Sequence, residues 1–247
     1  MQNMIELDKA SFVPLYYQLA DLLREHILEN SLKAGEAMPS EYDLMRQYQI
    51  SRGTVREAMR ILNHEGLIER RKGIGTFVNA PKIEHETGQV MGFSRVMQMS
   101  GKRPSAQVLE FRELKATAFL QEKLLMNHDE KVVLLKRLRF GDDEALLLEH
   151  SYFRMDVATR LKGEDLCSSV YGILREKHKY HLHRAENTIE ARLAELEEAK
   201  VLGIEIGDPV LILKRLVYFE NEDVPFEYAE DIYRADRTKF KIKAHIN

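Results

Sequence analysis

The sequence has little of what stabilises secreted proteins or anchors membrane proteins. Cys167 is the single cysteine among 247 residues, so an intrachain disulfide and a thiolate metal cluster are both excluded. No apolar run approaches the roughly 20 residues that span a bilayer. Charged residues interrupt the N-terminus at Glu6, Asp8 and Lys9, so it lacks the apolar core of a secretory signal. These absences predict a cytoplasmic protein that does not contact membrane.

The chain also lacks an overall excess of positive charge. Its formal net charge is -3, which excludes a uniformly basic nucleic-acid-binding protein, so any such surface must be local. Between Leu44 and Lys82, however, eight basic residues stand against three acidic ones, an excess of plus five. The bases are Arg46, Arg52, Arg56, Arg60, Arg70, Arg71, Lys72 and Lys82, and the acids are Glu57, Glu65 and Glu69. This segment is therefore the candidate polyanion-binding region.

The first 78 residues show the signals of three helices and a β-hairpin. Pro14 precedes a helical apolar pattern that ends near Asn30. Ser40 and Ser51 can each cap a further helix, and Gly66 suits a helix end. After Gly66 the period shortens to that of strands, with a basic turn before Thr76-Phe77-Val78. The spacing predicts a winged helix-turn-helix over residues 1–78, and a polar stretch over 79–89 is the expected linker.

Residues 90–247 show a mixed α and β pattern. Six strands and three helices are expected, and a motif near Leu135, LKRLRF followed by EHSYFRMD, returns near Leu213 as LKRLVYF followed by AEDIYRAD. The simplest interpretation of this repeat is two similar hairpins in one sheet. The expected strands are 105–111, 131–140, 145–153, 183–191, 210–219 and 226–233, and the expected helices are 116–125, 169–177 and 193–202.

The helix after Ser51 has the residues needed to enter a DNA groove. Val55, Met59 and Leu62 form an apolar stripe that can hold it on its scaffold. The polar residues lie elsewhere on the helix. Arginine is suited to bidentate contact with guanine, whereas hydroxyls at a helix N-terminus suit phosphate oxygens. The expected contacts on the helix are Ser51, Arg52, Gly53, Thr54 and Arg56, with Arg60 further along the same polar face. The cations Arg70, Arg71 and Lys72 on the hairpin are expected to add neighbouring contacts.

The segment from Met38 to Val78 resembles the DNA-binding domain of GntR-family bacterial transcription regulators. It carries their PSE, SRxTVR, LxxxGLI and GxGTFV patterns. The resemblance implies that Arg52, Thr54 and Arg56 are the principal DNA contacts. It further places Ser40, Glu41 and Ser51 near phosphates and implies that Gly73 and Gly75 shape the hairpin tip. Tyr42 departs from the pattern, since many members have arginine there.

Two arginines in the second region share a strand face with aliphatic residues. The period of two puts Val133, Leu135, Arg137 and Arg139 on one face. Such a mixture is costly in a core unless an anion compensates it. The compensation can come from a bound anion or from pairing with Asp142, Glu144 or Glu149, and spacing alone favours neither. Ser168 and Ser169 precede a helix, where they can bind phosphate or simply cap it.

The second region resembles the effector-binding domain of the HutC branch of GntR regulators, which has a chorismate-lyase-like fold. The segments GFSRVMQMSGKRPSAQVLEF, LLKRLRF, LLLEHSYF, SSVYGIL and PFEYAEDIYRADRTKF carry this resemblance. It implies an α+β domain with an antiparallel sheet. In members that bind phosphorylated sugars, the phosphate-binding residues correspond to Ser94, Arg137, Arg139, Ser169 and Tyr171. The groups that bind hydroxyls or amides correspond to Glu149, Glu227 and Tyr233.

The sequence as a whole thus predicts a ligand-responsive repressor without a metal or cofactor. It is expected to bind an inverted-repeat operator in duplex DNA as a homodimer and to be released by a small molecule, preferably a phosphosugar. A regulator that senses a non-sugar carboxylate is the alternative, and an enzyme of the lyase fold is a further one. The histidines His178, His181 and His183 lack the accompanying ligands of a metal site.

Overall fold

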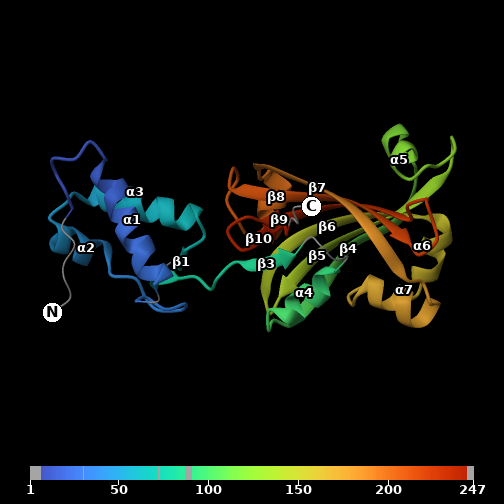
Figure 1. Ribbon diagram of the computed structural model, residues 1–247, viewed down its shortest axis with the longest axis horizontal. Coiled ribbons are helices and arrows are strands. Elements are labelled where there is room, and N and C mark those ends of the chain that lie inside the picture. The colour runs from blue at the N-terminus through green and yellow to red at the C-terminus, as the bar shows by residue number, and fades with distance from the viewer. Residues whose placement is uncertain (1–6, 30, 72, 87–90, 244–247) are drawn as a thin grey trace. The chain divides into compact units, whose positions relative to one another are not determined.

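The computed structural model describes residues 7–29, 31–71, 73–86 and 91–243. The chain divides into two compact units, with the boundary between Lys82 and Ile83 (Figure 1). No helix in these residues is long and apolar enough to cross a membrane.

Three helices form the body of the first unit: α1 (Leu15–Leu28), α2 (Glu41–Tyr48) and α3 (Arg52–His64). The two predicted caps are confirmed, because the Ser40 and Ser51 hydroxyls accept hydrogen bonds at 3.1 Å from the backbone N–H groups of Asp43 and Thr54. The helices surround one apolar core. Its fully buried members include Leu19, Ala20, Val55, Ala58 and Leu62.

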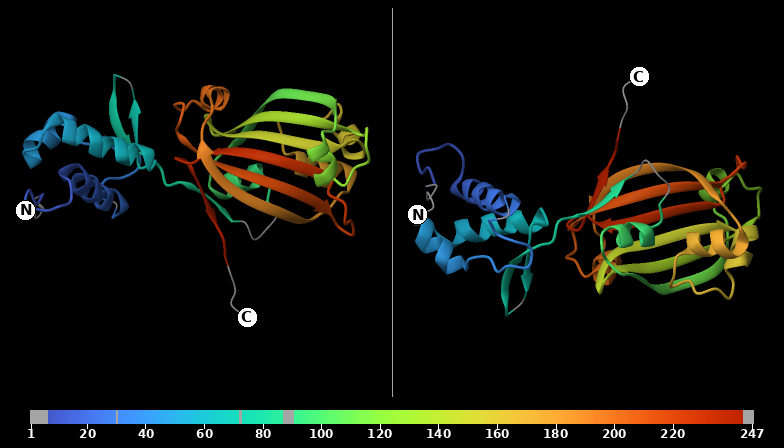
Figure 2. Two further views of the ribbon diagram at one scale, coloured as in Figure 1. Left: turned by 90° about the horizontal axis from the view of Figure 1, so that it is seen from above. Right: turned by 60° about the horizontal axis from the view of Figure 1, so that its bottom comes forward.

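A β-hairpin completes the first unit. Gly66 has a φ of 72°, a conformation that glycine adopts without strain, and it ends the helical segment. Strand β1 (Ile68–Arg71) then pairs antiparallel with β2 (Gly75–Val78), from Ile68 opposite Val78 to Arg71 opposite Gly75. Figure 2 shows this hairpin projecting beyond the helices of its unit. The predicted winged helix-turn-helix is confirmed.

The second unit is built on a six-stranded antiparallel sheet. Its order is β4-β5-β6-β9-β8-β7. The two copies of the repeated motif form the hairpins β5–β6 and β8–β9, which meet in the middle of the sheet through β6 and β9. The predicted pair of hairpins is thus confirmed. The strands are β4 (Pro104–Lys115), β5 (Lys131–Gly141), β6 (Glu144–Arg154), β7 (Leu182–Leu193), β8 (Pro209–Phe219) and β9 (Glu227–Arg234).

Helices cover both faces of this sheet. On one face lie α4 (Phe93–Met99), α6 (Met155–Leu161) and α7 (Val170–His178), whose apolar side chains pack against residues such as Leu135 and Leu147. Figure 2 shows α4 and α7 lying across the strands. The opposite face carries α5 (Ala118–Lys123) and α8 (Leu196–Leu202). The expected α+β class is confirmed, although α4 and α6 were not predicted from the sequence.

A short parallel pair of strands differs from the sequence-based expectation. Strand β3 (Ile83–Glu86) lies within the stretch 79–89 that was expected to be a linker, and it pairs with β10 (Thr238–Lys241). The side chains of β3 alternate, with Ile83 and His85 buried and Glu84 and Glu86 partly exposed. This segment therefore belongs to the second unit, because its two inward side chains join the apolar layer over the sheet.

Candidate DNA-contact surface and effector pocket

The start of α3 gathers the polar residues expected to contact DNA. Ser51, Arg52, Gly53 and Arg56 are exposed, and Thr54 is half-buried with its hydroxyl 2.9 Å from that of Ser51. A methyl group added at Gly53 would have only the Ser51 hydroxyl nearby, at 3.6 Å. Packing within the chain therefore leaves room for a larger residue there, so a need for glycine would have to come from close approach of a partner.

The three arginines of α3 differ in their partners. Arg52 donates from Nε to Glu41 at 3.1 Å, and Arg60 is held by Glu57. Among the described residues Arg56 makes no hydrogen bond or ion pair. Its guanidinium is therefore the most readily available of the three for an incoming phosphate or base.

The hairpin holds a second group of predicted contacts. The Arg71 guanidinium lies 4.5 Å from the centre of the Phe77 ring and binds Glu69. Gly73 has a φ of 76°, which fits the tight turn between the strands. Gly75 ends the turn, and Lys72 lies outside the described residues. The remaining predicted residues, Ser40 and Glu41, lie at the start of α2.

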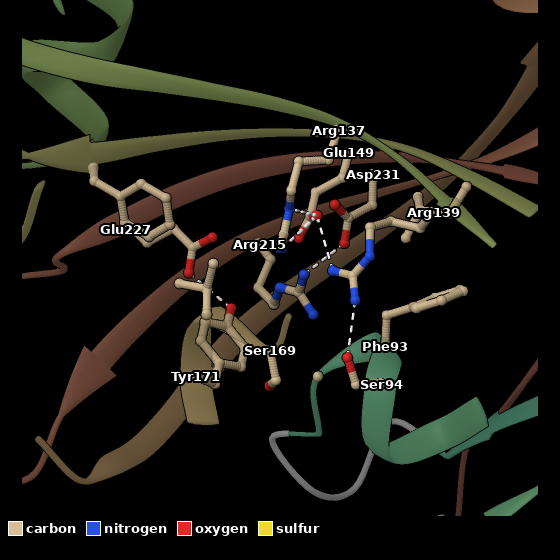
Figure 3. A pocket seen from close by; sticks show the side chains of 14 residues that line it. Phe93, Ser94, Arg137, Arg139, Glu149, Ser169, Tyr171, Arg215, Glu227 and Asp231 are labelled. Atoms are coloured by element: carbon tan, nitrogen blue, oxygen red, sulfur yellow. Dashed lines mark hydrogen bonds and ion pairs between the residues drawn. The ribbon is translucent and has the colours of Figure 1, made fainter. Parts of the chain in front are cut away.

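A small, partly open cavity lies between the sheet and the helices α4 and α7. Its volume of about 20 Å³ has room for about one water molecule. Seven of the eight predicted effector residues line it, together with Arg215 and Asp231. Those seven are Ser94, Arg137, Arg139, Glu149, Ser169, Tyr171 and Glu227 (Figure 3).

Glu149 neutralises both arginines of β5 in this structure. One of its oxygens, Oε2, lies 2.6 Å from Arg137 Nη2 and 3.2 Å from Arg139 Nη1. Arg139 also donates from Nη2 to the Ser94 hydroxyl at 2.9 Å. Of the pairings that spacing left open, the one with Glu149 is therefore formed. Asp142 and Glu144 instead bind other cations, such as Lys102 and Arg237.

Hydroxyl groups of α7 complete the wall of the cavity. The Ser169 hydroxyl accepts from the Gly172 N–H at 3.1 Å, so it serves as a helix cap while also lining the cavity. The Tyr171 hydroxyl donates to Glu227 Oε2 at 2.7 Å. Burial raises the pKa of both Tyr171 and Glu227. Tyr171 consequently keeps its proton, which it donates to the Glu227 carboxyl group.

The other two buried carboxylates have opposite pKa shifts. Burial by itself raises the pKa of Glu149, but Arg137 and Arg139 outweigh it and lower that pKa to about 2. Burial raises the pKa of Asp231 to about 7, although Arg215 opposes the change. At neutral pH Glu149 is therefore ionised, whereas Asp231 is the more easily protonated of the two carboxyl groups.

Several buried polar atoms of the site have no hydrogen-bond partner among the described residues. They are Nε of Arg139, Nε of Arg215 and Oδ1 of Asp231. Buried donors and acceptors are nearly always paired, because an unpaired one costs about 1–3 kcal/mol. Such atoms around one cavity indicate a binding site for a polar ligand.

Tyr233 is the predicted effector residue that the structure does not bring to the cavity wall. It is buried on the same face of the sheet, where its ring packs edge-on against His85 at 4.9 Å and against Phe240 at 5.4 Å. Sequence reasoning missed Arg215 and Asp231. The repeat could have revealed Arg215, because the LKR that contains Arg137 recurs with Arg215 in the same place.

Two family models match the chain and together cover most of it. Residues 15–78 match the gntR family of bacterial regulatory proteins, and residues 99–239 match the UTRA domain. The chain belongs to the GntR family of transcription regulators and carries a UTRA domain. This confirms the resemblance drawn from its motifs.

Relatives and solved structures agree with this assignment over nearly the full length. The chain is 33% identical over 236 residues to the HTH-type transcriptional repressor NagR of Bacillus subtilis, covering 96% of this chain and 97% of that protein. It is 29% identical to the mannosyl-D-glycerate transport/metabolism system repressor MngR of Escherichia coli, covering 94% and 96%. The crystal structure of PhnF from Mycobacterium smegmatis matches with a TM-score of 0.66 and 26% identity, over 93% and 100%.

These matches decide between the classes of function considered from the sequence. The relatives are transcription regulators over their whole length, and both units of this chain have counterparts in them. The chain is therefore a DNA-binding regulator with an effector domain. The enzyme alternative is set aside, because the matched relatives are transcription regulators and fold likeness to a lyase transfers no chemistry.

Proposed function

We propose that this regulator is a repressor that a phosphorylated sugar releases from its operator. In this proposal the chain acts as a homodimer that binds an inverted repeat. The effector binds in the cavity of the second unit, and its phosphate contacts Arg139 and Ser94. The observation that carries the proposal is the buried Arg139, which binds a hydroxyl and still has an unpaired Nε.

The DNA-binding half of the proposal rests on the N-terminal end of α3. One recognition helix contacts only a few base pairs, so two copies related by a two-fold axis are needed to read a longer site. Arg56 is exposed and has no hydrogen-bond or ion-pair partner in the part of the chain that the structure describes, and the Ser51 and Thr54 hydroxyls lie at the same end of the helix. Their guanidinium and hydroxyl donors suit guanine and phosphate oxygens.

The effector half rests on the chemistry of the cavity. A phosphate is best bound by forked guanidinium groups and hydroxyls, whereas carboxylates accept hydrogen bonds from sugar hydroxyls. The cavity offers both kinds of group. At about 20 Å³ the cavity alone is too small for a sugar, so the effector has to extend through its open side or displace side chains. Glu149 already binds Arg137 and Arg139, so a phosphate has to use the remaining donors of the site or displace one of its carboxylates.

The repressor names of two relatives support the direction of the response. NagR and MngR are both named repressors, and MngR is named for the transport and metabolism of a mannosyl glycerate. A ligand releases DNA only if it binds better to the arrangement that does not bind DNA. Operator DNA must then weaken effector binding by the factor with which effector weakens DNA binding.

The test uses the full chain, an operator selected from random duplexes, and a panel of ligands. The panel contains hexose 6-phosphates, inorganic phosphate and small dicarboxylates. We expect a hexose phosphate to raise the melting temperature and to weaken operator binding measured by fluorescence anisotropy. Arg139→Gln should abolish both responses and leave operator affinity unchanged.

Arg112→Gln is the matched control, because Arg112 is exposed on β4 and pairs with Glu110 outside the cavity. It should respond like the unaltered chain. A response to dicarboxylates alone would establish the carboxylate alternative. A hexose phosphate that still releases the Arg139→Gln variant would refute the assigned pocket.

A further inference from the structure

The three arginines around the cavity differ in how their donors are used. Arg137 has every nitrogen engaged. Its Nε and Nη2 bind Glu149 at 2.7 and 2.6 Å, and its Nη1 donates to the carbonyls of Leu166 and Ser168 at 2.8 and 3.0 Å. Arg137 thus attaches the segment before α7 to the sheet, and little of its donor capacity is left for a ligand.

Arg139 and Arg215 have donors to spare. Each has a buried Nε without a hydrogen-bond partner among the described residues. Arg215 binds Asp231 from Nη2 at 2.5 Å, and its guanidinium carbon lies 5.9 Å from the centre of the Tyr171 ring. In Figure 3 the ends of both guanidinium groups point toward the side of the pocket where Ser94 and Ser169 lie. Two open guanidinium groups therefore line one wall.

The repeated hairpins account for the second arginine, whereas its carboxylate partner Asp231 holds a place in the motif that Ser151 has in the first copy. Arg137 lies opposite Glu149 on β5 and β6, and Glu149 lies opposite Asp231 on β6 and β9. Arg215 occupies on β8 the place in the motif that Arg137 has on β5. Glu149 and Asp231 thus face each other on the two middle strands of the sheet. Arg137 lies on the strand next to that of Glu149, and Arg215 lies on the strand next to that of Asp231. Glu149 binds two arginines, whereas Asp231 binds Arg215 and has an Oδ1 without a partner among the described residues, so Asp231 is the less firmly held counter-ion.

We propose that Arg215 is a third arginine of the effector site, that it contacts the effector's anionic group together with Arg139, and that Asp231 is the counter-ion displaced by the effector. This inference rests on the proposed function and names the chemistry of its ligand. The Nε donors of Arg139 and Arg215, the donors of Arg215 that displacement of Asp231 would release, and the Ser94 hydroxyl suit a group with three acceptor oxygens and two charges. The site accordingly favours a phosphate monoester over a sulfate ester or a carboxylate.

The experiment measures binding of glucose 6-phosphate, glucose 6-sulfate and inorganic phosphate to the full chain by titration calorimetry. Arg215→Gln should weaken glucose 6-phosphate binding by about 10-fold or more, the usual effect of losing a hydrogen bond to a charged group. It should also reduce the preference for phosphate over sulfate ester. Asp231→Asn should instead tighten phosphate binding, because it removes the competing carboxylate and retains the shape.

An ion pair between Arg215 and Asp231 that served only to shape the pocket would give a different result. If the pair only shaped the pocket, Asp231→Asn would weaken phosphate binding as Arg215→Gln does, and that result would overturn the proposal. The double variant Arg215→Gln/Asp231→Asn retains a neutral pair and so protects folding; it should bind as weakly as Arg215→Gln. Unchanged affinity in either Arg215 variant would also refute the role of Arg215.

A control variant separates this result from loss of any buried ion pair. Arg234 binds Asp236 at 2.7 Å, is largely buried, and does not line the cavity. Arg234→Gln should leave phosphate affinity unchanged. If the unaltered chain binds neither glucose 6-phosphate nor inorganic phosphate, the proposed function fails and this inference with it. If it binds them and the Arg215 variants bind equally well, only this inference fails.

Discussion

Replacing the arginines of α3 one at a time gives a graded prediction for DNA binding. Arg52, Arg56 and Arg60 are spaced four residues apart and share one side of the helix. At about 1.5 Å per residue, Arg56 lies about 6 Å and Arg60 about 12 Å further along the axis than Arg52. The N-terminal residues of a recognition helix are the ones that contact base edges, so Arg52 and Arg56 should both matter more than Arg60.

Arg56→Ala should have the largest effect of the three. An arginine bound to guanine by two hydrogen bonds contributes about 1–3 kcal/mol, which corresponds to a loss of about 5- to 150-fold in operator affinity. Arg56 has no intrachain partner to lose among the described residues, so the free energy of unfolding should change by less than about 0.5 kcal/mol. Arg52→Ala should cost less, because Arg52 has to give up Glu41 before it can bind DNA.

The assay is fluorescence anisotropy with the operator and a scrambled duplex at several salt concentrations. A lost base contact reduces the difference between the two duplexes, whereas a lost phosphate contact lowers the salt slope by about 0.9. Arg60→Ala is the matched control, since Arg60 is held by Glu57 near the far end of α3. Equal losses for Arg60→Ala and Arg56→Ala would show that α3 does not enter the groove by its N-terminus.

Two further predictions concern a helix cap and a buried histidine. Ser51→Ala should lower the free energy of unfolding by about 1 kcal/mol, because the Thr54 N–H loses its partner, whereas Ser51→Asp should keep the cap and still weaken operator binding by repelling phosphate. Burial lowers the pKa of His85 to about 4, with Arg215 adding to the effect, so the unfolded chain takes up a proton that the folded chain does not. Because of this residue, the free energy of unfolding should fall by about 3 kcal/mol as pH decreases from about 6.5 to 4. Urea unfolding at several pH values measures this fall for the unaltered chain and for His85→Phe, which lacks the titrating group. If the difference between the two chains does not change with pH, the reasoning is wrong.

The first unit could be predicted from the sequence because its signals are local. A serine cap before α2 and α3, an apolar stripe on α3 and a glycine after it act over a few residues, and the structure reproduces each of them. The hairpin had the same advantage, since its turn residues lie between two short strands. The strands of the second unit could be predicted in the same way, from the local alternation of their side chains.

The parts that were missed depend on contacts between distant segments. Helix α4 begins after Gly92 without a side-chain cap. No local signal in the sequence therefore predicted this helix, which brings Ser94 to Arg139. The alternation of Ile83 and His85 is only four residues long, and its partner β10 lies at the other end of the chain. Asp231 was missed for a similar reason, because its partner Arg215 comes from a neighbouring strand.

The cost of the charged cluster also argues that it serves binding. Replacing a buried ion pair by apolar residues of similar volume is often neutral or stabilising, so stability alone gives no reason to bury three arginines and three carboxylates on one sheet face. Those six are Arg137, Arg139, Arg215, Glu149, Glu227 and Asp231. Their unpaired atoms represent stability that a ligand can restore. At a concentration 100 times its dissociation constant, a ligand adds about 2.7 kcal/mol to the free energy of unfolding, and completing those hydrogen bonds is the physical source of that gain.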